Sequence, residues 1–370
     1  MEGNSNIFLS LTSAGRSLDF NEAGSQYWWE TTGRDLANML RVAKYPDRTQ
    51  RSFLLYYKDF LCPLLGSAVE PNNETHMKSW TWDGSTHEYS FELKASSKAP
   101  DVRFVADFGQ LRPVDWEKPL DSTNTEKVVS SLATCVPEFD DTWYQALKTF
   151  MDCSHVSVPT QKVLIAEAGH LSPLLIGFDI LREVPADVGI LPVLGKVYFL
   201  PCIAAAAQKR TRFEYLASKP KDWENGARFL ATDLVSPEKA RLKLYLRCPD
   251  SNFDTIWDYF TLGGRIPGLN NFYDQYREFV THLERVGGDT RELTLQAVDK
   301  KVETGNRRKL TTMYFSLDSK YPYPAPKIAF YVRNVSANDT LVARSLDRWL
   351  SKYGWDDGDT SMEEQVSDAM

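Results

Sequence analysis

Two short stretches of the chain alternate cations with tyrosine. The polar members of stretches 196–201 and 241–247 are Lys196, Tyr198, Arg241, Lys243, Tyr245 and Arg247. Successive side chains of a β-strand point to opposite faces, so these residues share one face of their strand and the apolar residues share the other. Lysine and arginine bind phosphate oxygens, and the faces of tyrosine rings attract cations. The pattern predicts a surface that holds a polyanion beside an electron-rich wall.

Composition is that of an ordinary folded protein. The 370 residues are 42% hydrophobic and 25% charged, and the net charge of −7 argues against nucleic acid as a partner. No apolar run is long enough to span a bilayer, and the first residues lack the basic start and apolar core of a signal peptide. The five cysteines are odd in number and widely spaced, which favours the reducing cytoplasm and indicates neither a disulfide framework nor a zinc site.

Helical and strand-like segments alternate along the chain. We expect helices at 27–44, 47–61, 126–153, 202–217, 252–261, 269–286 and 337–353, and strands at 86–94, 101–108, 161–167, 174–181, 193–200, 240–247, 291–300, 308–317 and 327–333. The strand pairs favour antiparallel pairing. Because no Pro-, Gly- or Ser-rich linker divides the chain, we expect a single domain over residues 1–355, followed by a disordered acidic tail over 356–370.

Several of these strands have one polar and one apolar face, and two architectures satisfy that pattern. The first is an open antiparallel sheet with helices on one face and water on the other. The second is a closed barrel with helices outside and a polar lumen. Tyrosine and cations gather on the polar faces, which a solvent face does not usually show, but the residues alone leave both architectures open.

Several motifs together resemble the fungal aromatic prenyltransferases of the dimethylallyltryptophan synthase type. They follow one another in the family's order over residues 27–355. The stretches that carry the resemblance are WWETTG at 28–33, KVYFLP at 196–201, RLKLY at 241–245, TLGG at 261–264, YPYPAPKI at 321–328, Asn338-Asp339 and Gly354-Trp355. The resemblance implies an α+β fold, a closed barrel of ten antiparallel strands inside a ring of helices, built from repeated α-β-β-α units.

The resemblance also implies an activity, the transfer of a prenyl group from an allylic diphosphate to an electron-rich aromatic ring. Dimethylallyl diphosphate is the expected donor, and an indole of secondary (alkaloid) metabolism is the expected acceptor. Ionisation of the donor gives an allyl cation and pyrophosphate, and both charges need stabilisation while water is kept out. The implied partners are therefore two small molecules.

Site residues follow from the match to the family's motifs. The implied diphosphate ligands are Arg103, Lys196, Arg241 and Lys243, joined by Lys320 and Lys327 from their place around the last strand pair. The implied cation shield consists of Tyr198, Tyr245, Tyr314 and Tyr331. The family usually has another tyrosine two residues after the lysine of the last strand, and this chain has Ala329 there. That departure leaves room for a larger prenyl chain or acceptor.

Glu88 matches the glutamate that accepts a hydrogen bond from the indole N–H in relatives that use indoles. The base that removes the final proton is not identified. No DDxxD motif is present, so basic side chains take the place of a metal ion, and no cofactor is expected beyond the prenyl diphosphate.

Two other functions are compatible with the sequence. One is the same chemistry on a phenolic or polycyclic acceptor, or with a longer donor. The other is a non-catalytic barrel that binds a phosphorylated or flat aromatic ligand, although pure binding does not need a cation shield. The ring position, regular or reverse attachment and the oligomeric state, with a homodimer as one candidate, stay open.

Overall fold

The computed structural model forms two compact units, one of Met1–Arg210 with Ala231–Arg241 and one of Thr211–Leu230 with Leu242–Met370. It describes residues 7–13, 23–67, 81, 85–92, 100–109, 117, 120–151, 157–168, 173–183, 190–199, 227–248, 253–286, 311–317, 321–330, 339–354 and 361–364. Every structural statement below concerns these residues.

The first unit contains a four-stranded antiparallel meander. Its strands are β1 (His87–Glu92), β2 (Asp101–Ala106), β3 (Leu174–Ile180) and β4 (Val193–Phe199), paired in chain order. The residues that face one another across the ladder share a side of the sheet. One such row runs Tyr89, Phe104, Phe178 and Gly195, and the next, on the opposite side, runs Glu88, Val105, Gly177 and Lys196.

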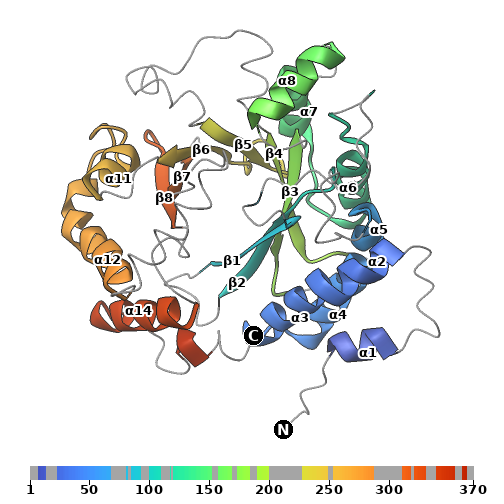
Figure 1. The fold of residues 1–370 in the computed structure, drawn as a ribbon, viewed down its shortest axis with the longest axis horizontal. Helices are drawn as coiled ribbons and strands as arrows, with labels where there is room; N and C mark the ends of the chain where they lie inside the picture. The colour runs from blue at the N-terminus through green and yellow to red at the C-terminus, as the bar shows by residue number, and fades with distance from the viewer. Residues whose placement is uncertain are drawn as a thin grey trace. The chain divides into compact units, whose positions relative to one another are not determined.

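Helices cover the apolar side of this sheet. They are α1 (Ile7–Ser13), α2 (Ala23–Trp28), η1 (Trp29–Gly33), α3 (Arg34–Val42), α4 (Asp47–Tyr56), η2 (Tyr57–Leu61), α5 (Cys62–Leu64), α6 (Thr123–Cys135), α7 (Thr142–Met151) and α8 (Val158–Ala168). Helices α3 and α4 lie side by side, α6 contacts β3 and α7 contacts β4 (Figure 1). Phe53 of α4 packs edge-on against Phe104 and Phe178, whose rings stack at 4.8 Å. This aromatic layer leaves the polar side of the sheet available for the site.

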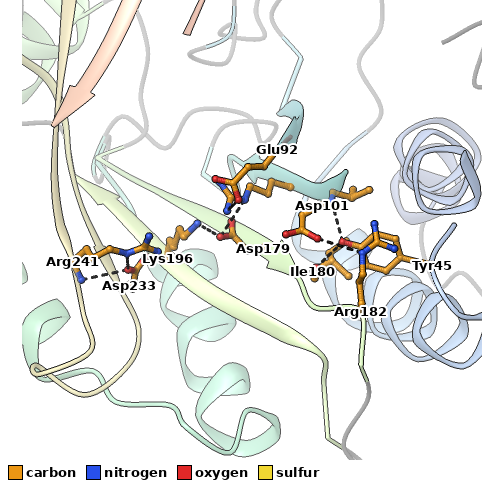
Figure 2. A network of polar contacts seen from close by, with 11 residues as sticks. Tyr45, Glu92, Asp101, Asp179, Ile180, Arg182, Lys196, Asp233 and Arg241 are labelled. Carbon is orange, nitrogen blue, oxygen red and sulfur yellow. Dashed lines mark hydrogen bonds and ion pairs between the residues drawn. The ribbon is translucent and has the colours of Figure 1, made fainter. Parts of the chain in front are cut away.

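A clamp of polar contacts joins the helical layer to β3. Tyr45 follows α3, and its buried hydroxyl donates to the carbonyl of Ile180 at 2.8 Å and accepts the backbone N–H of Val102 at 3.0 Å. The guanidinium of Arg182 lies 4.4 Å from the Tyr45 ring centroid, a cation–π distance, and pairs with Asp101 (Figure 2). The clamp fixes the end of β3, next to Asp179.

The second unit contains the strands β6 (Leu242–Cys248), β7 (Thr311–Leu317) and β8 (Ala325–Phe330), which form antiparallel ladders. Its helices are α11 (Phe253–Phe260), η4 (Leu269–Phe272), α12 (Tyr273–Val286) and α14 (Asp339–Lys352). Leu246, Met313 and Phe315 form a buried core with Ile256 and Phe260 of α11. Tyr245 and Tyr314 are sequence neighbours of these core residues and therefore face the other side of the sheet, as does Lys243, two residues before Tyr245.

Strand β5 (Ala227–Asp233) was not expected from the sequence, and it is divided between the two units after Leu230. Asp233, at its end, is 2% exposed. Eight strands lie in the described part of the chain, and the ladders β1–β2, β2–β3, β3–β4, β6–β7 and β7–β8 are antiparallel.

The strand expected at 161–167 is wrong, because Val158–Ala168 forms helix α8. A short apolar run such as Val163–Ala166 fits a strand and a helix equally well by periodicity. Here Ser157 precedes the helix, its carbonyl accepts the backbone N–H of Gln161 at 2.9 Å, and Pro159 lies in the first turn. These are helix-start features that decide the conformation.

Other expectations have mixed outcomes. The helical span 126–153 is two helices, α6 and α7, separated at Val136-Pro137. The expected helix 202–217 and strand 291–300 lie outside the described residues. Within the acidic tail, residues 361–364 contain a helical turn, whose Met362 and Glu363 backbone N–H groups donate to the Asp347 carboxylate at 2.7 and 3.0 Å. No helix among the described residues is long and apolar enough to cross a membrane.

Candidate active site

Cations and carboxylates alternate on the polar side of the first unit's sheet. Arg103 of β2 and Lys196 of β4 both pair with one carboxylate, Asp179 of β3, the strand between them. Figure 2 shows the contact of Lys196 with Asp179. Arg103 reaches Asp179 at 3.3 Å and also pairs with Glu92 of β1. The structure therefore brings two of the expected diphosphate ligands together through an acidic residue that the sequence reasoning missed.

Arg241 is held by a second missed carboxylate. Its Nε donates to Asp233 Oδ2 at 2.8 Å, and its backbone N–H donates to the same atom at 3.3 Å. Asp233 is buried, whereas the Arg241 side chain is 38% exposed. The buried carboxylate of Asp233 thus holds the Nε of Arg241, while part of the side chain stays exposed, where an anion can reach it.

Lys196 is the most deeply placed of these cations, at 4% exposure. Burial lowers the pKa of its ammonium group, and the Asp179 carboxylate opposes that effect. Arg103 lowers the same pKa and Asp233 raises it, so both acids help to keep Lys196 charged. Asp179 was detectable in the sequence as the single carboxylate of the otherwise apolar strand Leu174–Ile180, because such a group is rarely buried without a partner. Asp233 was not detectable in this way, because it ends strand β5, which was not expected.

Glu88 is exposed on the polar side of β1, in the same cross-strand row as Lys196. Two strands separate them, and their positions in that row are Val105 and Gly177. Tyr198, two residues after Lys196, lies on the same side of β4 and is 9% exposed. The Glu88 carboxylate, the Lys196 ammonium group and the Tyr198 ring therefore share one face of the sheet.

Two shield candidates meet in the second unit. Tyr245 of β6 and Tyr314 of β7 are directly opposed in the ladder, and their ring centroids are 4.9 Å apart. Lys327 of β8 continues the row, with its Nζ 5.9 Å from the Tyr314 ring centroid. Phe229 contacts Tyr245 edge-on at 6.0 Å. The row is an aromatic surface with a cation at its edge.

Lys243 lies two residues before Tyr245 on the same side of β6, opposite Ser316, and is 4% exposed, whereas Lys327 is exposed. Ala329, which replaces a family tyrosine, is opposite Thr312 in the β7–β8 ladder. Lys320 and Tyr331 lie outside the described residues. In the described part of the chain, no group of three or more His, Cys, Asp or Glu side chains has a metal-binding arrangement.

The comparisons with known proteins give the family. The sequence profile of the family described as tryptophan dimethylallyltransferase matches residues 24–217 and 212–365. The prenyltransferase phnF of Penicillium herquei is 41% identical over 393 residues, which cover 97% of this chain and 87% of that protein. The DMATS-type prenyltransferase mfmD of Annulohypoxylon moriforme is 40% identical, with coverage of 93% and 84%. This chain therefore belongs to the tryptophan dimethylallyltransferase family and is a prenyltransferase.

More distant proteins extend the comparison. Xanthone prenyltransferase B of Emericella nidulans is 27% identical and covers 88% of this chain and 76% of its own length. The crystal structure of NotF in complex with brevianamide F and DMSPP has a TM-score of 0.75 at 17% identity, covering 98% of this chain and 90% of that one. NotF has the prenyltransferase barrel fold, and the likeness to it shows that fold for this chain, while the closed barrel of ten strands stays a prediction.

Proposed function

We propose that the enzyme transfers a dimethylallyl group from dimethylallyl diphosphate to a carbon of an aromatic ring, with an indole as the first acceptor class. The allylic C–O bond breaks and pyrophosphate leaves with the electron pair. A ring carbon then attacks the allyl cation, and the resulting arenium ion loses a proton. The observation that carries this proposal is the polar sheet face on which paired cations adjoin tyrosine.

Arg103, Lys196, Arg241 and Lys243 are proposed to bind the diphosphate, with Lys320 and Lys327 assisting. Support comes from the ion pairs with Asp179 and Asp233, which hold three of these cations in place before any ligand arrives. Preorganised cations stabilise a developing negative charge without a reorganisation cost, so they favour ionisation of the donor. They also make a metal ion unnecessary for that step.

Tyr198, Tyr245, Tyr314 and Tyr331 are proposed to shield the allyl cation. The contact between the tilted rings of Tyr245 and Tyr314 supports this role, because ring faces stabilise a cation and do not form covalent bonds with it as readily as water does. We further propose that the chain closes into the family's ten-stranded barrel, which would exclude water from the cation. The eight described strands and the likeness to NotF support this closure.

A phenolic or polycyclic acceptor is the second candidate, and the name of the xanthone prenyltransferase favours it. Glu88 distinguishes the two classes. A carboxylate that accepts the indole N–H hydrogen bond raises the electron density of the ring as charge develops. A phenol activates its own ring through its hydroxyl oxygen and depends less on that carboxylate.

The free thiols of Cys62 and Cys135 fit the reducing cytoplasm, which we propose as the working compartment. The partners are the two small-molecule substrates, and a homodimer is proposed only as a state to be measured.

The decisive experiment incubates the purified chain with dimethylallyl, geranyl and farnesyl diphosphates and a panel of indoles and phenols, in buffer containing EDTA. We expect a prenylated indole by mass spectrometry and undiminished turnover without Mg²⁺. Lys243→Ala should lower kcat/KM by about a hundredfold or more, because it removes one stabilising charge at the leaving group. Lys239→Ala is the matched control, since Lys239 is 60% exposed and pairs with Glu138 on the surface. The absence of product with every pair would contradict the proposal.

A further inference from the structure

Gly177 leaves a gap on the polar face of the first unit's sheet. It lies in the middle of β3, opposite Val105 of β2 and Lys196 of β4, in the row that begins with Glu88. Every other position of that row carries a side chain. Gly177 is not among the glycines with positive φ, so its backbone is open to any residue and does not explain the glycine.

The Tyr198 ring occupies this gap. A Cβ placed on Gly177 would lie 2.7 Å from Tyr198 Cε2, 3.2 Å from its hydroxyl oxygen and 3.4 Å from Cζ. Tyr198 itself pairs with Leu175, so its ring leans along the sheet by two residues to lie over Gly177. Carbon atoms in ordinary contact are 3.4–4 Å apart. A methyl group at position 177 would therefore push the ring away from the sheet by about 0.7 Å or more at its nearest atom.

The direction of that movement matters for the site. The backbone of the sheet lies behind the ring, so a displaced ring moves away from the sheet. It then takes up space on the side that carries Lys196 and Glu88. We propose that Gly177 determines which substrates fit, because it lets the Tyr198 ring lie close over β3 and so sets the room beside Lys196 for the prenyl chain. This inference rests on the proposed function, in which Tyr198 faces the prenyl cation.

The chain contains a matched control in Gly195. It lies in β4, the neighbouring strand, opposite Phe178 on the apolar side of the same sheet. A Cβ there would meet Leu132 Cδ1 at 2.8 Å and Leu234 Cδ1 at 3.1 Å. Gly195→Ala thus introduces the same methyl group with a similar clash, but against Leu132 of α6 and Leu234 after β5, on the side of the sheet opposite Tyr198.

The test measures binding by calorimetry for the wild type, Gly177→Ala and Gly195→Ala. The probes are inorganic pyrophosphate, dimethylallyl S-thiolodiphosphate and geranyl S-thiolodiphosphate, whose bridging sulfur slows ionisation. For Gly177→Ala we expect an unchanged pyrophosphate Kd within twofold, and at least tenfold weaker binding of the longest analogue that the wild type binds. Gly195→Ala should lower the melting temperature and leave the ratio of these two Kd values unchanged.

A double-variant cycle keeps the inference testable if Gly177→Ala folds poorly. Tyr198→Ala removes the ring, so adding Gly177→Ala to it should change the Kd ratio by less than twofold. An unchanged ratio in Gly177→Ala, or an equal shift in Gly195→Ala, would overturn the role of Gly177 while leaving the proposed function in place. If the wild type binds pyrophosphate but neither analogue and forms no prenylated product, the proposed function fails and this inference fails with it.

Discussion

Each cationic side chain of the first unit's site forms an ion pair with a neighbouring carboxylate. Lys196 and Arg103 share Asp179, and Arg241 rests on Asp233. Such pairs gain little net stability when buried, because desolvation offsets much of the attraction. For the proposed function their value lies in geometry and charge state, because they hold the side chains in place and oppose the loss of the Lys196 proton.

Asp179→Asn tests that role at the residue level. The substitution keeps the size of the side chain and removes the charge that raises the Lys196 pKa, while the burial and the Arg103 charge that lower it remain. The Lys196 pKa should fall, so the alkaline limb of the kcat/KM profile should move to lower pH. Glu126→Gln is the control, because Glu126 pairs with the part-exposed Lys148 away from the site. An alkaline limb that stays in place would remove Asp179 from this role.

Glu88→Ala separates the two acceptor classes. If Glu88 accepts the indole N–H hydrogen bond, its loss should lower kcat for indoles by about a hundredfold and for phenols by much less. Ser90→Ala, on the same side of β1, is the control and should affect neither class. An equal loss for indoles and phenols, measured by product formation under saturating donor, would undo the proposed role of Glu88.

At the level of elements, a buried polar chain ties β1 to the helices. The Tyr57 hydroxyl lies 2.9 Å from His87 Nε2 and hydrogen-bonds to Thr32, and Thr86 Oγ1 lies 2.8 Å from His87 Nδ1. Tyr57 begins η2 and Thr32 lies in η1, both π-helical turns. Such turns are often found near functional sites, and here they meet the strand that carries Glu88.

His87 makes this junction sensitive to acid. Burial lowers its pKa from 6.5 to about 3, so between these values the unfolded chain binds a proton that the folded chain does not. The contribution of His87 to the free energy of unfolding is fully present above pH 6.5. It is lost as the pH falls toward 3, by up to about 1.4 kcal/mol per pH unit. Urea unfolding at pH 7.0 and 5.0 tests this. At pH 7.0 the free energy of unfolding of His87→Gln should be below that of the wild type, and it should fall less than the wild-type value between pH 7.0 and pH 5.0.

Tyr57→Phe is the control for that measurement, because it removes the hydrogen bond and keeps the imidazole. It should lower stability at both pH values and retain the steep dependence on pH. A wild-type dependence as shallow as that of His87→Gln would show that His87 titrates normally.

Elements were predictable where periodicity was unambiguous. The alternation around Lys196, Lys243 and Tyr314 gave β4, β6 and β7 close to their observed bounds. The prediction of a strand at 161–167 was wrong because this short apolar run lacks a decisive period. The start of the helix at Ser157 decided its conformation. Strand β5 was missed because Phe229 and Ala231 are buried by long-range packing rather than marked by local pattern.

At the level of the whole molecule, the chain passes between its two compact units three times, and one passage falls inside β5. Neither unit is a continuous piece of sequence. We therefore expect residues 1–355 to unfold as a single cooperative domain, with one calorimetric transition whose van't Hoff and calorimetric enthalpies agree. Two resolved transitions would instead make the units independent domains.

The sequence by itself determined the family, the chemistry and the side of each strand on which the cations and tyrosines lie. These are local properties, since the alternation of side chains along a strand depends on the backbone alone. Only the tertiary structure paired Lys196 and Arg103 with Asp179, placed Asp233 under Arg241 and laid Tyr198 over Gly177. Those contacts join residues of different elements, and strand order and register, which no local pattern contains, decide which residues meet.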